Sequence, residues 1–387
     1  MNPYEARPPF EQGPIRPPSE ARSLLIRVTR NCAWNKCAFC HTYQGANFSL
    51  RPVSEIKEDI LRMAQAAERI RTLSVENGED GCIGEKTFNR IFSPEGNQDE
   101  CLRSLASWLY YGGESVFLQD ADSLIMKTDD LADVIASLRE AFPSIRRITT
   151  YARAKTAARK SVDELKRLRE AGLSRIHIGM ETGYDPLLKF IRKGVTAAEQ
   201  VAGGQKVREA GISLCEYVMP GLGGSRWSVE HAVETARALG RINPDHIRLR
   251  TLQVVPGTWL AEKVRQGEFQ ALDDEAILRE IRLFFETLEG ITTEVVSDHI
   301  LNLLEELEGN LPGDRERIIG SIDRFFALSG EERMVFRLGR RMGIYRYLDD
   351  LKDPLTYRQI GQLARKYREK DPLELERDLA DLRRRYI

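Results

Sequence analysis

The sequence contains no apolar run that approaches the roughly 20 residues a membrane-spanning helix requires. Its first 22 residues are polar and rich in proline, and they lack the apolar middle of a secretion signal. The formal net charge is only −1, so no overall charge excess attracts the chain to nucleic acid or to a membrane surface. We therefore expect a cytoplasmic protein with no membrane span, whose partner is not nucleic acid.

Cysteine is also sparse, with six residues in a chain of 387. Six cysteines in a long chain without a secretion signal do not indicate a disulfide framework. Three of them, Cys32, Cys37 and Cys40, nevertheless lie within nine residues of each other. The other three are scattered at Cys82, Cys101 and Cys215. The crowded group is therefore the first candidate for a site.

Short β-rich runs alternate with amphipathic stretches over the first two thirds of the chain. The runs are Leu24–Thr29, Ser115–Gln119, Arg147–Tyr151, Arg175–Met180, Ser213–Met219 and His246–Val254. One helix between them is bounded by a Ser-x-x-Glu capping box at Ser161 and by Gly172. Strands separated by helices imply parallel βαβ units. Six such units predict an α/β fold, a partial (β/α)6 barrel of TIM type, with a doubly wound sheet as the alternative; both bind ligands at the C-terminal strand ends.

We expect three parts along the chain. Residues 1–22 are predicted to form an extended N-terminal arm, and residues 23–270 the barrel core. Residues 74–100 are polar and rich in glycine, which indicates an insertion in that core. Residues 271–387 are dense in Leu, Arg and Glu, which predicts a helical C-terminal domain.

The three crowded cysteines form a C-x4-C-x2-C pattern directly after the first predicted strand. Three thiolates on one loop can hold three irons of a four-iron cluster and leave the fourth iron open to a ligand. A zinc site that adds His41 is an alternative, although a histidine adjacent to Cys40 suits one tetrahedral site poorly. Incidental buried cysteines are a third interpretation.

The cysteine segment resembles the cluster loop of the radical S-adenosylmethionine (SAM) superfamily. That loop usually reads C-x3-C-x2-C with an aromatic residue before the last cysteine, and Phe39 occupies the aromatic position. One additional residue between Cys32 and Cys37 departs from the usual spacing. The resemblance extends from about residue 22 to 260 and is strongest to the methylthiotransferase and anaerobic coproporphyrinogen oxidase branch.

The resemblance implies contacts to SAM at several strand ends. Asp120 or Asp122, after the second strand, would accept from the SAM ammonium, with helix N-capping as the alternative role. Glu181 lies in a Gly-Met-Glu-Thr-Gly turn similar to one in the family and would bond the ribose hydroxyls. Lys193 matches the basic position that pairs with the SAM carboxylate, and Arg192 is the alternative.

Three more residues are expected on the same strand-end face. Met219 begins a glycine-rich turn that resembles the family turn whose main chain passes the adenine. Tyr151 and Arg153 follow the third strand and would contact SAM or the substrate.

Two residues are candidates for catalysis. Cys215 lies in a predicted strand and would supply a thiyl radical or a proton, unless it is simply a small buried hydrophobe. His299 follows Asp298 and would donate a proton or a ligand. The alternative is that Ser297 or Asp298 caps a helix there.

The resemblance implies a 4Fe–4S cluster and SAM as cofactors. In the superfamily the reduced cluster cleaves SAM to methionine and a 5′-deoxyadenosyl radical, which abstracts a substrate hydrogen. We expect a small-molecule substrate, function under low oxygen, and a low-potential electron donor such as flavodoxin or ferredoxin. The alternatives are an RNA-modifying enzyme, a cluster or haem chaperone of the same fold, and a zinc protein. The RNA alternative would use tail arginines at 337, 340, 341 and 383–385, which lie among many acids.

Overall fold

The structure, a computed structural model, describes residues 10–94, 96, 99–368 and 372–384. Eight strands form one sheet, in the order β1 (Leu24–Arg27), β4 (Ser115–Gln119), β5 (Arg147–Ala152), β6 (Leu173–Glu181), β7 (Ser213–Val218), β8 (His246–Leu249), β9 (Thr293–Val296) and β10 (Gly309–Leu311). A separate antiparallel pair consists of β2 (Thr29–Arg30) and β3 (Ser49–Leu50).

The pairs β1/β4, β4/β5, β5/β6, β7/β8 and β8/β9 are parallel, and β10 runs antiparallel to β9. Helices separate the successive parallel strands, so the chain has the α/β architecture of a partial (β/α)6 barrel, as the sequence predicts. All six predicted strands are present. The last, β8, ends at Leu249 instead of Val254, and the Arg250 N–H donates to the Val218 carbonyl as the final bond of the β7/β8 ladder.

The helices are α1 (Val53–Glu76), α2 (Glu85–Phe92), α3 (Glu100–Tyr110), α4 (Thr128–Ala141), α5 (Ala154–Arg159), α6 (Val162–Ala171), α7 (Asp185–Phe190), α8 (Ala197–Glu209), α9 (Gly224–Ile242), α10 (Trp259–Arg265), α11 (Asp274–Thr287), α12 (Arg315–Ala327), α13 (Gly330–Arg341), α14 (Pro354–Arg368) and α15 (Pro372–Arg384). Short 3₁₀ turns lie at η1 (Pro18–Glu20), η2 (Ser123–Ile125) and η3 (Leu348–Lys352). Among the described residues, no helix combines the length and apolar character needed to cross a bilayer.

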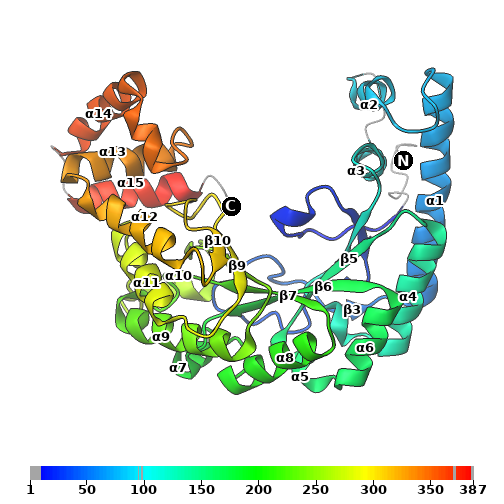
Figure 1. Cartoon of the computed structure of the whole chain (residues 1–387), viewed down its shortest axis with the longest axis horizontal. Coiled ribbons are helices and arrows are strands. Elements are labelled where there is room, and N and C mark those ends of the chain that lie inside the picture. The colour runs from blue at the N-terminus through cyan, green and yellow to red at the C-terminus, as the bar shows by residue number, and fades with distance from the viewer. Residues whose placement is uncertain (1–9, 95, 97–98, 369–371, 385–387) are drawn as a thin grey trace. The chain divides into compact units, whose positions relative to one another are not determined.

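The chain divides into two compact units. Unit 1 comprises the described residues of Met1–Asn35, Thr42–Ile178 and Lys206–Ser213. Unit 2 comprises those of Lys36–His41, Gly179–Gln205 and Leu214–Ile387. In unit 1, α1 packs against α4, and α4 packs against α6 (Figure 1). In unit 2, α9 packs against α11, and α13 packs against α14 and α15.

The capping box of α6 is present as predicted. The Ser161 hydroxyl accepts from the Glu164 N–H at 3.1 Å, and the Glu164 carboxylate accepts from the Ser161 N–H at 2.8 Å. The helix ends at Gly172, whose φ of 130° is open to glycine and strained for other residues.

The segment before β1 is held against unit 1 by specific polar contacts. The Gly13 N–H donates to the side-chain oxygen of Gln119 at 2.8 Å, and the Gln119 amide donates back to the Gly13 carbonyl at 3.0 Å. The carboxylate of Glu11 accepts from Arg27 and Arg30, each at 2.9 Å. These contacts tie the segment to the C-terminal ends of β1 and β4.

A buried carboxylate organises the C-terminal helices. Asp274, at the start of α11, accepts from Arg341 at 2.6 Å and lies 3.3 Å from both Arg337 and Arg383. Burial alone would raise the pKa of Asp274, but the three arginines outweigh it and hold that pKa well below its usual range. Residues 271–387 contain β9 and β10 as well as the predicted helices. The domain boundary at residue 270 remains a prediction.

Candidate functional site

The loop that follows β2 carries the three crowded cysteines. All six cysteines of the chain are thiols rather than disulfides, and Cys32, Cys37 and Cys40 are half-buried. The Asn35 N–H donates to the sulfur of Cys32 at 3.4 Å, and the Cys40 N–H donates to the Cys37 carbonyl at 3.2 Å. Hydrogen bonds of this N–H to sulfur kind tune the potential of iron–sulfur clusters.

The donor set of the loop consists of three thiols. Each thiolate of such a set binds a different iron of a 4Fe–4S cluster. Three thiols on one loop therefore fit the chemistry of that cluster.

Main-chain bonds fix the segment between the last two cysteines within unit 2. The Ala38 N–H donates to the Ile191 carbonyl at 2.8 Å, and the Ala38 carbonyl accepts from the Leu260 N–H at 2.9 Å. Ala38 is also buried in an apolar cluster with Ile191 and Leu260, and Phe39 packs against that cluster. The segment is therefore held by backbone and side-chain contacts together.

Four residues predicted to contact SAM lie together in unit 2. Lys193 donates to the Glu181 carboxylate at 2.8 Å, and its ammonium lies 5.7 Å from the centre of the Phe39 ring. The Met219 N–H donates to the Glu181 carbonyl at 3.1 Å. Arg192, the alternative to Lys193, instead lies over the Trp259 ring at 4.3 Å. The structure thus groups residues that are up to 180 positions apart in sequence.

The conformation at the end of β6 depends on a glycine. Glu181 has a φ of 64°, and its carboxylate folds back over Gly179. A Cβ at position 179 would collide with that carboxylate and lie 3.1 Å from the Lys193 ammonium. Gly179 therefore provides the space in which the Lys193–Glu181 pair forms.

A further carboxyl near this pair was not predicted. Glu216 on β7 is buried, and its pKa is raised well above the usual value by burial and by the charge of Glu181, against the opposing effect of Lys193. The sequence does contain a signal for this buried carboxyl, because an acidic residue lies inside the β-rich run Ser213–Val218.

The turn that begins at Met219 is held by a buried histidine. His231 is 1% exposed; its Nε2 lies 3.1 Å from the Met219 carbonyl, and its Nδ1 lies 2.8 Å from the Thr182 hydroxyl. Because a carbonyl only accepts, Nε2 carries the proton and Nδ1 accepts from Thr182. Burial lowers the pKa of His231 to about 4, so the ring is neutral at neutral pH.

The same turn is held from α11 by Glu280. One carboxylate oxygen accepts from the Gly221 N–H and the other from the Ser228 hydroxyl, both at 2.6 Å. Glu280 is 4% exposed, and burial raises its pKa to about 7, although both hydrogen bonds oppose the rise. The turn therefore rests on two buried titratable groups, Glu280 and His231.

Glu280→Gln is expected to change how stability depends on pH. The folded-state pKa lies above the unfolded value of 4.5, so ionised Glu280 is disfavoured by folding and stability falls as the pH rises from about 4.5 to about 7. Relative to wild type, the free energy of unfolding of the variant should rise by up to about 3 kcal/mol as the pH increases across that window. Urea midpoints measured at pH 4.5 and 7.5 test this. A difference between the two proteins that is the same at both pH values would contradict it.

In unit 1, Asp120 is fully buried at the end of β4. It accepts from Arg27 at 2.8 Å, from the Asn31 N–H at 3.0 Å and from the Tyr43 hydroxyl at 2.8 Å. These contacts tie the strand end to the loop that carries Cys32. A bond from Asp120 to the SAM ammonium stays a prediction.

Asp122 lies at the start of η2, but its side chain does not cap that turn, so the N-capping interpretation is wrong. It accepts from the Thr156 hydroxyl at 2.6 Å and from the Arg153 N–H at 3.2 Å. Burial raises the pKa of Asp122 to about 6, although these bonds oppose the rise. The Arg153 guanidinium lies over the Trp34 ring at 5.0 Å. Asp122 therefore orients the start of α5, beside the cysteine loop.

Tyr151 packs edge-on against two neighbouring rings on β4 and β6. Its ring centre lies 5.1 Å from that of Phe117 and 5.9 Å from that of His177. Contacts of this geometry stabilise the strand face. A role for Tyr151 in binding SAM or substrate stays a prediction.

The two predicted catalytic residues share a neighbour, Arg248 on β8. Burial alone would lower the pKa of Arg248, but nearby Tyr217, Asp298 and Cys215 raise it, and Cys215 itself is buried in β7. Burial lowers the pKa of His299 to about 4, assisted by positive charge that includes Arg248. Both residues are thus near the same cation, and their catalytic roles stay predictions.

The alternative of a helix N-cap before His299 is wrong. Residues 297–302 form an irregular turn between β9 and β10. The Ser297 hydroxyl donates to the Leu304 carbonyl at 2.9 Å, and Asp298 accepts from Arg248 at 3.2 Å.

Parallel βα units with polar groups at the strand ends are an architecture that many α/β enzymes use. The model of the Radical SAM superfamily matches residues 26–236, which is more than half of the chain. This chain therefore belongs to the radical SAM superfamily. Its cofactors are a 4Fe–4S cluster and SAM.

Similar proteins have varied functions. A tRNA uridine(34) acetyltransferase of Methanocaldococcus jannaschii is 24% identical over 113 residues, which cover 29% of this chain and 21% of that protein. Biotin synthase of Bacillus pumilus is 32% identical over 117 residues, which cover 30% of this chain and 34% of that protein. This chain thus matches at most about a third of the length of either relative. Among solved structures, the radical SAM methyltransferase TsrM of Kitasatospora setae has a TM-score of 0.43 and 14% identity, over 88% of this chain and 60% of that one.

Proposed function

We propose that Cys32, Cys37 and Cys40 hold the 4Fe–4S cluster and that the enzyme abstracts hydrogen from a small-molecule substrate. When bound and reduced, the cluster supplies the electron that cleaves SAM to methionine and a 5′-deoxyadenosyl radical. The observation that supports the proposal best is the group formed by Phe39, Glu181, Lys193 and Met219. Phe39 lies between two of the cysteines, so the group and the cluster loop share one segment.

The residues of this group have complementary chemistry for SAM. The Lys193 ammonium would pair with the SAM carboxylate, and the Glu181 carboxylate would accept from the ribose hydroxyls. The turn after Met219 offers main chain to the adenine, and Glu280 and His231 hold that turn in place. Lys193 and Glu181 pair with each other, so two charged groups in a half-buried place each have a partner.

Lys193→Met is expected to weaken SAM binding by about 10- to 100-fold. The change removes one charge-assisted hydrogen bond, which contributes about 1.5–3 kcal/mol. Lys189→Met is the matched control, because Lys189 is an exposed lysine at the end of α7. Equilibrium dialysis of SAM against the cluster-loaded protein measures both. Equal losses in the two variants, or none in Lys193→Met, would contradict the assignment.

The reaction itself is tested by anaerobic reconstitution. The protein should take up about four irons, show broad charge-transfer absorption, and release 5′-deoxyadenosine when SAM and dithionite are added. Stoichiometric zinc without iron uptake would overturn the proposal. A cluster that binds SAM but never cleaves it would indicate the chaperone function. In the cell the electron would come from a low-potential carrier such as flavodoxin or ferredoxin.

RNA modification is the second candidate function, because one relative is a tRNA uridine(34) acetyltransferase. The tail arginines do not support it. Arg340 and Arg341 are each 2% exposed, and they bind Glu305 and Asp274 within the protein. Arg337 is also buried and pairs with Glu376 at 2.7 Å, whereas the side chain of Arg384 and the whole of Arg385 lie outside the described part of the chain. Co-purifying tRNA with steeply salt-dependent binding would favour this candidate.

A further inference from the structure

One face of β8 carries a column of basic side chains. Residues two apart on a strand point to the same side, so His246, Arg248 and Arg250 share this face of the strand and its end. The first two have acidic partners: His246 lies 2.9 Å from Glu294 on β9, and Arg248 lies 3.2 Å from Asp298 just after β9. The third, Arg250, is exposed, and among the described residues its guanidinium has no hydrogen bond and no ion pair.

Arg250 lies at the edge of the sheet where βα folds bind ligands. It follows β8 directly, and its N–H donates to the Val218 carbonyl, at the end of β7, at 2.9 Å. β7 lies between β8 and β6, and β6 ends at Glu181, which also belongs to unit 2. Neighbouring strands are about 4.8 Å apart, so about 10 Å of sheet separates Arg250 from Glu181. A small molecule can span that distance to the group proposed to hold SAM.

A histidine supplies a second donor close to Arg250. The Leu301 N–H donates to Nδ1 of His299 at 3.2 Å, so Nδ1 accepts and Nε2 carries the proton of the neutral ring. Burial lowers the pKa of His299 to about 4, and the positive charge of Arg250 assists, so the ring is neutral at neutral pH. Within the part of the chain that the structure describes, no group accepts from Nε2. One cationic and one neutral donor are therefore available at this strand end.

The turn that carries His299 is fixed against the end of β8. The side-chain oxygen of Asn302 accepts from both the N–H and the hydroxyl of Thr251 at 3.0 Å, and Thr251 follows Arg250 directly. The Asn302 N–H donates to the His299 carbonyl at 2.9 Å, and Arg340 of α13 donates to the Asn302 carbonyl at 3.1 Å. Asn302, Thr251 and Arg340 are all buried. These contacts preorganise the two donors, which lowers the entropic cost of binding a ligand.

We propose that Arg250 and His299 bind a carboxylate group of the substrate. A guanidinium binds a carboxylate through two parallel N–H donors, and the imidazole N–H adds a bond to one of the oxygens. One cation and one neutral donor balance the single charge of a carboxylate, whereas a phosphate dianion would require a second cation. Arg248, the nearest on the strand, is already paired with Asp298. The inference rests on the proposed function for the place of the reaction, and it names the substrate class as a small carboxylic acid.

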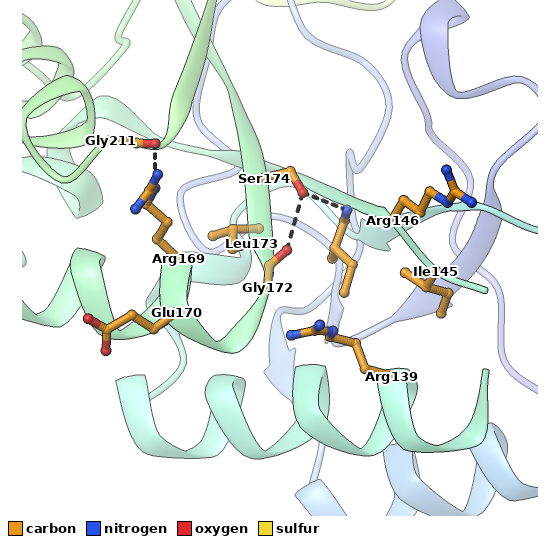
Figure 2. A pocket seen from close by; sticks show the side chains of 10 residues that line it. Arg139, Ile145, Arg146, Arg169, Glu170, Gly172, Leu173, Ser174 and Gly211 are labelled. Atoms are coloured by element: carbon orange, nitrogen blue, oxygen red, sulfur yellow. Dashed lines mark hydrogen bonds between the residues drawn. The ribbon is translucent and has the colours of Figure 1, made fainter. Parts of the chain in front are cut away.

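A pocket of unit 1, of about 550 Å³, contains a control arginine (Figure 2). Arg146 lines this pocket, and its side chain is 80% exposed. The pocket lies where β5 and β6 begin, the edge opposite to the ligand sites of βα folds. Arg146 lies 3.3 Å from the Glu114 carboxylate. It therefore matches Arg250 in exposure and charge, but it has an acidic partner and the wrong place on the sheet.

The test titrates the full chain, prepared anaerobically and without SAM, with benzoate, with its neutral isostere benzamide and with phenyl phosphate. Ligand-observed NMR measures dissociation constants up to the millimolar range. In Arg250→Gln the dissociation constant of benzoate should rise by at least about tenfold, the loss of one charge-assisted contact, and in Arg146→Gln it should stay within about twofold. His299→Gln, which keeps an N–H donor, should retain binding better than His299→Leu. Circular dichroism checks that each variant is folded.

Tighter binding of benzoate than of the other two probes, lost in Arg250→Gln, supports the site. Tighter binding of phenyl phosphate overturns the assignment to a carboxylate. Absence of benzoate binding to wild type, or equal losses in Arg250→Gln and Arg146→Gln, overturns the site itself. Equilibrium dialysis of SAM should give the same affinity for Arg250→Gln and wild type, and a loss there would assign Arg250 to SAM instead of the substrate.

The titration contains no SAM and needs no reduced cluster, so its failure is distinct from failure of the proposed function. A protein that cleaves SAM but binds no probe overturns only the carboxylate site. One that binds benzoate through Arg250 but assembles no cluster overturns only the cluster assignment.

Discussion

Cys37→Ala is expected to abolish both cluster assembly and the formation of 5′-deoxyadenosine. Two thiolates cannot retain a site-differentiated 4Fe–4S cluster that three thiolates hold. Without the cluster there is no electron for SAM. Iron content should fall from about four per chain in wild type to near zero, and the charge-transfer absorption should disappear. Metal analysis, absorption spectra and chromatography of the nucleoside products measure the three quantities on one preparation.

Cys82→Ala is the control for this change. Cys82 is an exposed thiol between α1 and α2, in the segment predicted as an insertion. Its removal should leave iron content and SAM cleavage at the wild-type level. Equal losses in the two variants would mean that Cys82 is also a ligand. Retention of full iron by Cys37→Ala would contradict the assignment of the cluster loop.

Asp274→Asn is expected to lower the free energy of unfolding by about 3–5 kcal/mol. The amide has the same shape but no charge, so Arg337, Arg341 and Arg383 would keep their burial and lose their common counter-ion. Uncompensated buried charge is costly because the protein interior solvates it poorly. Urea unfolding at pH 7, followed by circular dichroism, measures the loss.

An exposed ion pair provides the comparison. Asp349 lies 2.6 Å from Arg324, but both side chains are 57% exposed, so Asp349→Asn should lower the free energy of unfolding far less than Asp274→Asn does. High salt should weaken this surface pair further and leave the difference caused by Asp274→Asn nearly unchanged. Similar losses in the two variants would show that burial of Asp274 does not have the importance we assign to it.

Local patterns predicted most of the fold. The six strands were recognisable as short β-rich runs, and α6 by a capping box and a glycine that act over three or four residues. The end of β8 was not predictable in this way, because it depends on where pairing with the neighbouring strand β7 stops, at Val218 and Leu249. The expected cap at Ser297 was wrong for a similar reason, since its hydroxyl bonds the distant Leu304 carbonyl.

The residues of the candidate site were likewise predictable only in part. Family resemblance identified Glu181, Lys193 and Met219, which the structure brings together with Phe39. It did not identify Glu280, whose partner Gly221 is 59 residues away, because a glutamate on an amphipathic helix looks like an ordinary surface residue.

The main-chain bonds of Ala38 have a consequence for how the cofactor is acquired. In zinc fingers the metal folds the peptide, so the energy of binding is also the energy of folding. Here the segment from Cys37 to Cys40 is anchored at Ile191 and Leu260 by bonds that involve no cysteine sulfur. Iron and sulfide would therefore meet a preorganised scaffold, and loss of the cluster to oxygen would leave a folded, reloadable apoprotein instead of an unfolded chain.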